Sequence, residues 1–285
     1  MREQEGRSMT THAPTPIEIR DAWDAIADGF DRHVTPHNLE FGDRIVARLD
    51  LGPGLQVLDV GAGSGALSIP AARTGADVLA IDIAPTMVER LRARATADGL
   101  TTLHADVGDG TCLDLDSDSF DVSVSLNAVS LFPDLTGGLN EMARVTKEGG
   151  QVVVGTFGPL PEVEFVGFFL GALRAVAPNQ LPPADDPPPP FRLAEPETFR
   201  RTLEAVGLKQ ATIEVVSWEA TFGSVEHFLE VIMPSNPIAG QLTAGLTADQ
   251  WDQLRQVLDG MLRERSAGQA GAVLRSQVNI GRGTV

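Results

Sequence analysis

The residues with the clearest chemical potential lie in the stretch "VLDVGAGSGALSIPAARTGADVLAIDIAP", residues 57–85. Its glycines Gly61, Gly63 and Gly65 allow the backbone to turn tightly and to approach a ligand. The helix that should follow offers unpaired N–H groups, which favour an anion. Asp82, about 20 residues further on, can accept hydrogen bonds from ribose hydroxyls. A dinucleotide site shares these features, since "GAGSGA" satisfies the relaxed G-x-G-x-x-[GA] pattern, so the glycines alone leave the ligand open.

Two further carboxylates distinguish the possible ligands. Asp59 precedes the first glycine, where it would repel a pyrophosphate but suit a ligand with an ammonium group. Asp106 ends the run "LHAD", where its carboxylate could accept a hydrogen bond from an adenine amino group while the Val107 N–H donates to a ring nitrogen. Together with Asp82, these acids describe a nucleoside with a cationic tail.

The elements that must position these residues alternate between strand and helix. Strands are predicted at 56–60, 77–81, 102–105, 120–126 and 150–157, and helices between them at 65–75, 85–98 and 136–147. Such alternation indicates βαβ units and a parallel sheet. Continuous apolar runs such as "VVV" fit strands that are buried on both faces.

The segments on either side of this core are less regular. Residues 17–50 predict helices separated by a turn at "DRHVTPHN". Beyond Phe157 we expect helices at 162–176, 195–208, 224–235 and 247–265, strands at 210–218 and 272–283, and a rigid proline-rich surface loop at 178–191. The expected organisation is a disordered lead-in at 1–15 and one domain at 16–285. The core of that domain spans about 50–157 with 196–217 and 270–282, and its lid spans 16–45, 160–195 and 220–268.

Composition narrows the class of protein. A net charge of −17 and a pI of about 4.6 argue against nucleic acid and anionic membranes as partners, because both select basic patches. The lone cysteine, Cys112, excludes an intramolecular disulfide and a cysteine-rich zinc site, and no His, Asp or Glu spacing suggests a metal. With no apolar run of about 18 residues and no signal-like N-terminus, we expect a cytoplasmic protein. Arginine greatly outnumbers lysine, which hints at a GC-rich bacterial genome. The sequence leaves the oligomeric state open.

Five segments together resemble the class I S-adenosylmethionine-dependent methyltransferases, in their small-molecule branch. They are "VLDVGAGSG", "AIDIAPTMVERLRARA", "HADVGD", "FDVSVSLNAVSLFPD" and "LNEMARVTKEGGQVVV", and the resemblance covers about residues 15–157. It implies an α/β fold: a Rossmann-like, doubly wound, mostly parallel seven-stranded sheet with an inserted helical lid. It also implies S-adenosylmethionine as cofactor and S-adenosylhomocysteine as product. The implied cofactor-binding residues are Asp59, Gly61, Ala62, Gly63, Asp82, Ile83, Met87, Asp106, Val107 and Asn127.

The sequence departs from this family in two places. Many relatives carry a histidine pair where Ser130 and Leu131 stand, and a tyrosine where Phe30 stands. The chain has no tyrosine, so the possible bases are histidines. The candidate catalytic base is His37, because the resemblance places its segment over the methyl end of the cofactor.

The other histidines are weaker candidates. His33 shares the segment of His37, His104 is predicted to be a packed core residue, and His227 lies on a lid helix where it could be solvated. The candidate substrate-binding residues are Phe30, His37, Phe132 and Phe157. The segments "FFLGAL" and "FLEVIMPSNP", which we expect to cover the site, suggest a largely apolar, medium-sized acceptor.

The sequence therefore predicts methyl transfer to a small, apolar metabolite, as in secondary metabolism. The acceptor atom stays open. An alternative is an enzyme of the same fold that uses the bound cofactor for another reaction, such as cyclisation or decarboxylation. A nicotinamide oxidoreductase is disfavoured by Asp59, and a nucleic-acid methyltransferase by the acidic charge.

Overall fold

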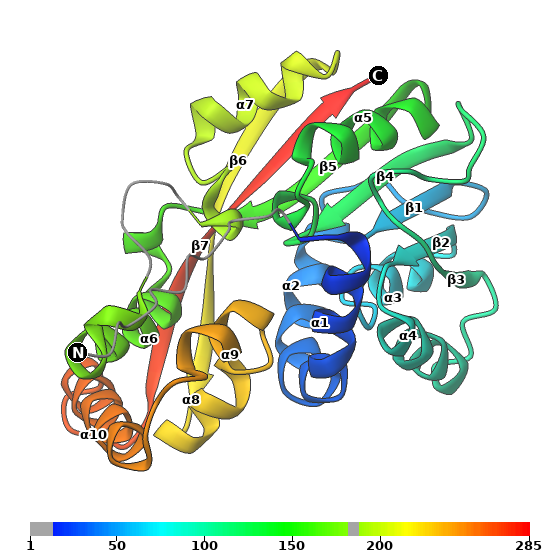
Figure 1. The fold of residues 1–285 in the computed structure, drawn as a ribbon. Coiled ribbons are helices and arrows are strands. Elements are labelled where there is room, and N and C mark those ends of the chain that lie inside the picture. Colours follow the sequence, from blue (N-terminus) through cyan, green and yellow to red (C-terminus); the bar gives the residue numbers. More distant parts are fainter. Residues whose placement is uncertain (1–13, 182–187) are drawn as a thin grey trace, which may run out of the picture.

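Seven strands form one sheet in the order β3-β2-β1-β4-β5-β7-β6, as seen in a computed structural model that describes residues 14–181 and 188–285 (Figure 1). The strands are β1 (Gln56–Val60), β2 (Asp77–Asp82), β3 (Leu103–Val107), β4 (Phe120–Leu126), β5 (Thr146–Phe157), β6 (Lys209–Phe222) and β7 (Ala272–Thr284). Strands β1 to β5 are parallel, and β7 runs antiparallel to both of its neighbours. The expected doubly wound, mostly parallel sheet is confirmed. The predicted lead-in, up to residue 13, and residues 182–187 of the proline-rich segment lie outside the described residues.

Alternating side chains of the central strands feed two separate cores, one on each face of the sheet. Val57 and Val153 belong to the core under α2 (Thr35–Val46), α3 (Ser68–Arg73) and α4 (Pro85–Ala97). Leu58 and Val152 belong to the core under α5 (Leu135–Val145) and α7 (Pro196–Ala205). Because both faces are covered, the central strands are apolar throughout, as the sequence pattern indicated.

The predicted turn "DRHVTPHN" is helical, which corrects the sequence interpretation. Helix α1 (Pro16–Gly29) continues through a single π-helical turn, η1 (Phe30–Val34), directly into α2. Thr35 closes the junction by donating from Oγ1 to the Phe30 carbonyl, 3.3 Å away. Pro36 directly follows the π-helical turn, where the regular α-helical hydrogen-bond pattern is interrupted, so its missing N–H is tolerated there. His37 therefore projects from a helix and not from a surface turn.

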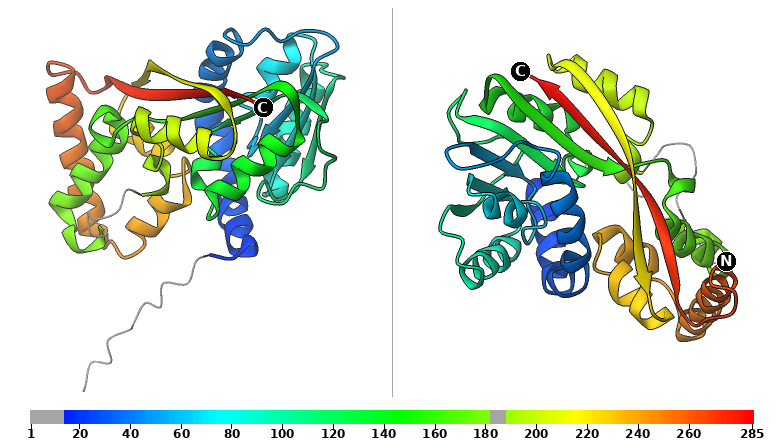
Figure 2. Two further views of the ribbon diagram at one scale, coloured as in Figure 1. Left: turned by 90° about the horizontal axis from the view of Figure 1, so that it is seen from above. Right: turned by 180° about the vertical axis from the view of Figure 1, so that it is seen from behind.

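Strands β6 and β7 extend beyond the rest of the sheet. β5 pairs with β7 only from Val278 to Thr284, whereas β6 continues to pair with β7 as far as Phe222 and Ala272. We call this two-stranded extension, residues 217–222 and 272–277, the β6–β7 ribbon. Figure 1 shows helices gathered around it, and Figure 2 shows the same arrangement from above and behind.

These four helices and the ribbon form what we call the distal lobe. The helices are α6 (Glu164–Val176), α8 (Val225–Ile232), α9 (Pro237–Thr243) and α10 (Ala248–Arg265). Buried faces of α10 (Leu254, Leu258) and of α6 (Phe165, Phe169) belong to one core that continues into the ribbon. The predicted lid segments 160–195 and 220–268 thus stand mainly on extended strands and not on a separate sheet, and β6 runs past the predicted core limit at residue 217.

Candidate active site

The glycine loop after β1 adopts the conformation that its sequence predicted. Gly61 and Gly63 have φ values of 72° and 54°, a region that favours glycine. A Cβ on Gly61 would lie 2.3 Å from the Ala128 Cβ, so no larger residue fits there. The loop is fixed from below, where the N–H groups of Gly61 and Ala62 both donate to the Ile81 carbonyl at 2.8 and 3.1 Å.

Asp82 lies at the end of β2 and organises the backbone around it. Its two carboxylate oxygens accept hydrogen bonds from the Gly63 N–H (2.8 Å) and from the Ala84 N–H (2.9 Å). Burial raises the pKa of this carboxyl, and the two N–H donors counteract that rise. The carboxylate is thus held rigidly between the glycine loop and the start of α4, where Met87 is buried beside it.

Asn127 combines two features that are rare outside functional sites. Its φ of 52° is left-handed although it carries a side chain, and its N–H donates to the Gly155 carbonyl at 2.8 Å. Its side-chain Oδ1 is buried and has no hydrogen-bond partner. A buried acceptor without a partner costs free energy on the order of 1–3 kcal/mol, which a bound donor would recover.

A cavity of about 1180 Å³ adjoins these groups. It is lined by all of the predicted cofactor- and substrate-binding residues except Asp59, Asp106 and Val107: Gly61, Ala62, Gly63, Asp82, Ile83, Met87, Asn127, Phe30, His37, Phe132 and Phe157. Drug-sized ligands occupy pockets of roughly 300–1,000 Å³, so this cavity has room for a second molecule beside a nucleoside.

Asp59 has a different environment from the expected one. Only 1% of its surface is exposed, it does not line the cavity, and it accepts a short hydrogen bond from the Ser68 hydroxyl on α3. Burial raises its pKa to about 7, and the neighbouring Asp82 adds to the rise. The side chain of Asp59 thus points toward α3 and away from the cavity. Its hydrogen bond connects the end of β1 to the start of α3.

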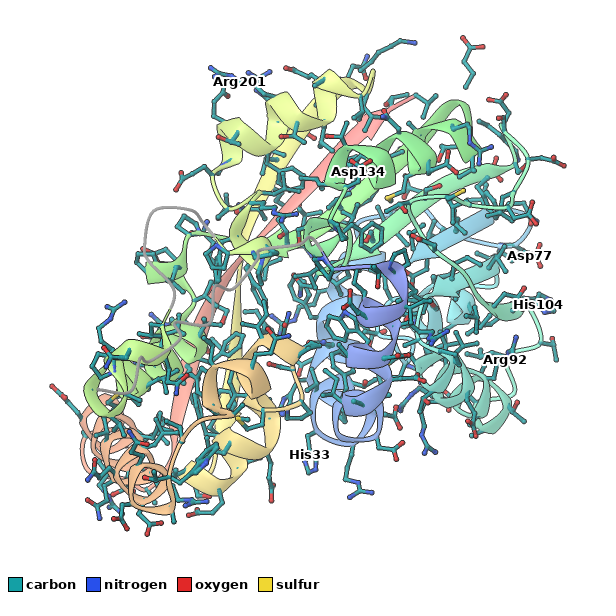
Figure 3. The ribbon with its side chains drawn as sticks, viewed as in Figure 1. His33, Asp77, Arg92, His104, Asp134 and Arg201 are labelled. Atoms are coloured by element: carbon teal, nitrogen blue, oxygen red, sulfur yellow. The ribbon has the colours of Figure 1, made fainter. Side chains whose placement is uncertain are left out.

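Asp106 and Val107 lie on the outer side of β3, away from the cavity. Asp106 is exposed and forms an ion pair with Arg92 of α4 at 2.9 Å, and 51% of Val107 is exposed. The residues of this turn that do line the cavity are Gly108 to Thr111. Figure 3 labels Arg92 and His104 at this outer edge, and His104 is exposed, so its predicted core position is wrong. β3 is the last strand of the sheet, which leaves alternate side chains in solvent.

The distal lobe supplies a largely apolar wall. Phe157 packs against Phe165 and Phe191, with ring centroids 5.6 and 6.2 Å apart. Trp218 and Phe222 come from the β6–β7 ribbon and line the same cavity. The cavity thus has a polar end at the glycine loop and an apolar end at the ribbon.

Of the four histidines in the described ranges, His37 faces this cavity. Its ring lies near those of Phe222 and His227, with centroids 6.5 and 6.1 Å away. Burial lowers its pKa below the usual 6.5, and His227 lowers it further, while Glu40 raises it. His227 does not line the cavity, and its Nδ1 accepts from the Gly223 N–H at 3.1 Å. His33 points away at the lower end of the helices in Figure 3, 4.0 Å from Glu230.

Sequence reasoning missed several residues that line the cavity. They include Trp23, Asp109, Thr111, Arg174, Arg192 and Trp218. The dipeptide Asp109-Gly110 is a turn signal next to a strand end, and could have drawn attention to that loop. The two arginines and Trp218 carry no such signal, because only the folded chain brings their segments to the glycine loop.

Comparison with known proteins gives the same family. Residues 57–150 match the model of a methyltransferase domain. The chain is 32% identical over 176 residues to aklanonic acid methyltransferase of a Streptomyces species, covering 58% of this chain and 80% of that protein. It is 37% identical over 137 residues to nocamycin O-methyltransferase of Saccharothrix syringae, covering 47% of this chain and 48% of that protein. The chain thus belongs to the class I S-adenosylmethionine-dependent methyltransferases, whose cofactor is S-adenosylmethionine.

The chain spans about half the length of the first curated relatives it matches, among them a Mycobacterium tuberculosis protein that is 36% identical over 148 residues. Among solved structures, the [4+2]-cyclase SpnF has the same fold, with a TM-score of 0.58 and 16% identity over 95% of this chain and 97% of that one. At that identity the likeness extends to the fold alone. Within the described residues, no helix is long and apolar enough to cross a membrane.

Proposed function

We propose that this protein transfers a methyl group from S-adenosylmethionine to a medium-sized, largely apolar metabolite, with His37 as the base. The observation that carries the proposal is a single cavity with two ends of different chemistry. The glycine loop, Asp82 and Asn127 line one end, and aromatic side chains line the other. A donor and an acceptor can therefore meet in it.

The polar end has groups that fit the cofactor. Asp82 can accept from the ribose hydroxyls while its hold on Gly63 and Ala84 keeps the carboxylate in place. The unpaired Oδ1 of Asn127 can accept from the ammonium group of the amino-acid moiety. Met87 and Ile83 offer apolar contact for a base. We expect Asp59 to act indirectly, by fixing the loop, and not by touching the ligand.

The chemistry needs little more from the protein than orientation and a dry site. When bound, S-adenosylmethionine supplies an electrophilic methyl group on a sulfonium. The residues of the chain align the acceptor with it and exclude water, for which the aromatic wall around Phe157 and Phe222 is suited.

His37 can remove a proton from a hydroxyl or an acidic carbon of the acceptor. Because its pKa is lowered, the imidazole is neutral at neutral pH and one ring nitrogen is free to accept a proton. This role compensates for the absence of the histidine pair at Ser130 and Leu131. The acceptor class is suggested by the relatives' names, which include a nocamycin O-methyltransferase and an aklanonic acid methyltransferase.

The first test is calorimetric titration with S-adenosylmethionine, S-adenosylhomocysteine and NADH in parallel. We expect micromolar binding of the first two and none of the third. Binding of NADH alone would overturn the proposal. A screen of polyketide and aromatic acceptors with methyl-labelled cofactor then measures transfer.

The same screen separates the alternative function. An acceptor that is converted without a gain of 14 Da, and only in the presence of cofactor, would identify a cyclisation, as an isomer of unchanged mass. The [4+2]-cyclase with this fold makes that outcome worth measuring, although its likeness is one of fold.

A further inference from the structure

Two arginines that line the cavity form no ion pair with any residue in the ranges that the structure describes. Arg174 lies in the last turn of α6, and Arg192 follows the short 3₁₀ helix η5 (Pro189–Phe191). Among the residues that the structure describes, neither lies within 4.0 Å of a carboxylate oxygen. Arg174 has no hydrogen-bond partner in the same ranges, and Arg192 has one, the Phe132 carbonyl.

These unpaired cations are unusual in this chain. It has 39 acidic residues against 22 basic ones, and most of its arginines are ion-paired. Even inside the cavity, acids are available but are occupied elsewhere. Asp109 accepts from the N–H and hydroxyl of Thr111, and Asp134 accepts from the Gly137 N–H at the start of α5, where Figure 3 labels it. Glu195 also lines the cavity, but it pairs with neither arginine.

Arg192 is held in position by one hydrogen bond, which leaves most of its N–H donors available. Its Nη1 donates to the Phe132 carbonyl at 2.8 Å, and its side chain is only partly exposed. A guanidinium has five N–H donors, so one hydrogen bond leaves an edge free for a second partner. Two parallel N–H groups match the two oxygens of a carboxylate, and such a bidentate pair is strong and directional. Arg174 is exposed, and adds a second positive charge to the lining of the cavity.

We infer that the acceptor carries an anionic group, such as a carboxylate, on an otherwise apolar skeleton, and that Arg192 binds this group with Arg174 adding charge. The inference rests on the proposed function, since it assigns a feature to the acceptor of that reaction. The cavity chemistry supports it on its own terms. A neutral apolar ligand would leave both guanidinium groups unpaired beside an apolar wall, where an anion is favoured.

The cofactor's own carboxylate is the competing partner for these arginines. A role in cofactor binding and a role in acceptor binding give different results in a binding experiment, because only the first changes the affinity for S-adenosylhomocysteine.

The test uses two fluorescent probes that differ in one group. 8-Anilinonaphthalene-1-sulfonate carries an anion, and N-phenyl-1-naphthylamine has the same aromatic skeleton without it. Both are titrated into the wild-type protein, with and without saturating S-adenosylhomocysteine. The variants are Arg192→Gln, Arg192→Lys and Arg174→Gln. Arg32→Gln is the matched control, because Arg32 is an exposed arginine outside the cavity lining.

We expect Arg192→Gln to weaken the anionic probe about tenfold, the size of a lost charge-assisted hydrogen bond, and to leave the neutral probe unchanged. Arg192→Lys should recover part of the loss, and Arg174→Gln should show a smaller one. Arg174→Gln also serves as a second variant because it disturbs no hydrogen bond among the described residues. Arg32→Gln should bind both probes as the wild type does.

Calorimetry with S-adenosylhomocysteine on the same variants separates the possible failures. If the wild type binds no S-adenosylhomocysteine, the proposed function is wrong. If it binds, but the arginine variants bind both probes like the wild type, the inference is wrong while the proposed function stands. If Arg192→Gln loses S-adenosylhomocysteine affinity and keeps the anionic probe, Arg192 serves the cofactor and the inference is also overturned.

Discussion

The two ends of the cavity are built by opposite means. At the polar end, short loops follow the carboxyl ends of neighbouring parallel strands. They bring together groups from one βαβ unit, such as Gly63 and Asp82, which are 19 residues apart. At the apolar end, the wall comes from distant segments, with Phe157 beside Phe191 and Trp218 on a ribbon that extends past the sheet. The first end is a fixed frame of hydrogen bonds, and the second is a packed surface of aromatic side chains.

Substitutions at the two ends of the cavity should therefore have different consequences. Backbone N–H groups and a buried carboxylate define a ligand of fixed geometry, so we expect substitution there to weaken cofactor binding. An aromatic wall is defined by volume, so substitution there changes which ligand fits. The distal lobe is thus the part in which acceptor specificity can change while the frame stays constant.

The largest expected effect is on turnover, at the apolar end. His37→Ala should lower kcat by about 10²- to 10⁴-fold, the range of general base catalysis, while affinity for S-adenosylhomocysteine stays nearly constant. Steady-state kinetics and calorimetry measure the two quantities. A wild-type kcat would remove His37 from the mechanism.

The pH profile gives an independent check on the same residue. The His37 pKa lies below 6.5, and the base must be neutral to accept a proton. Turnover should therefore be full at neutral pH and fall as the pH drops below 6.5, and it should be flat above. His227→Ala gives a second test of the same assignment, because His227 lowers the His37 pKa but does not line the cavity. This variant should move the midpoint of the profile to a higher pH.

The polar end is tested by a matched pair of aspartates. Asp82→Ala should weaken S-adenosylhomocysteine binding by roughly a hundredfold or more, because two hydrogen bonds to a charged group contribute about 1.5–3 kcal/mol each. Asp106→Ala should leave affinity unchanged, since Asp106 is exposed and pairs with Arg92. Calorimetry on both variants measures this contrast. Equal losses would restore Asp106 to the adenine contact that the family resemblance implied, and no loss in either would remove Asp82.

How much of the molecule the sequence could predict follows from the same contrast. The glycine spacing and the apolar strand runs specified the sheet, the loop and Asp82, because these depend on local spacing and on burial on both faces. The environment of Asp59 could not be predicted, since its partner Ser68 is set by the packing of α3. The exposed positions of Asp106 and Val107 could not be predicted either, because the place of β3 at the end of the sheet is a property of the strand order, and their role in cofactor binding stays a prediction.

The distal lobe was the least predictable part. Helices α6, α8 and α10 were predicted as segments and α9 was missed, and nothing in the chain shows that β6 and β7 continue past β5. Trp218 lines the cavity because of that extension, and Arg174 lies on α6, which packs against the same core; no motif marks either residue. The contribution of residues 217–222 to the cavity is therefore known from the folded structure and could not be predicted from the sequence.

The pH dependence of stability tests what the buried carboxyl group of Asp59 costs the folded state. With the native pKa near 7 and an unfolded pKa near 3.8, the folded state binds the proton more tightly, so stability falls as pH rises through 7. Between pH 5 and 8 this amounts to roughly 2–3 kcal/mol, an order-of-magnitude figure. Thermal unfolding of Asp59→Asn should show that much less loss over this range than the wild type. The same slope in both proteins would exclude the titration of Asp59.

The smallest expected effect tests the wall without touching the frame. Ala220 lies on the β6–β7 ribbon, is buried at 5% exposure and lines the cavity, so Ala220→Leu fills part of the acceptor space. Acceptor KM should rise several-fold while S-adenosylhomocysteine affinity is unchanged, because the two ends are separate. Thr221→Leu is the control: the next residue of the strand points to the opposite face and is exposed. If Ala220→Leu weakens cofactor binding instead, the two ends of the cavity are one site, and the separation argued for the distal lobe fails.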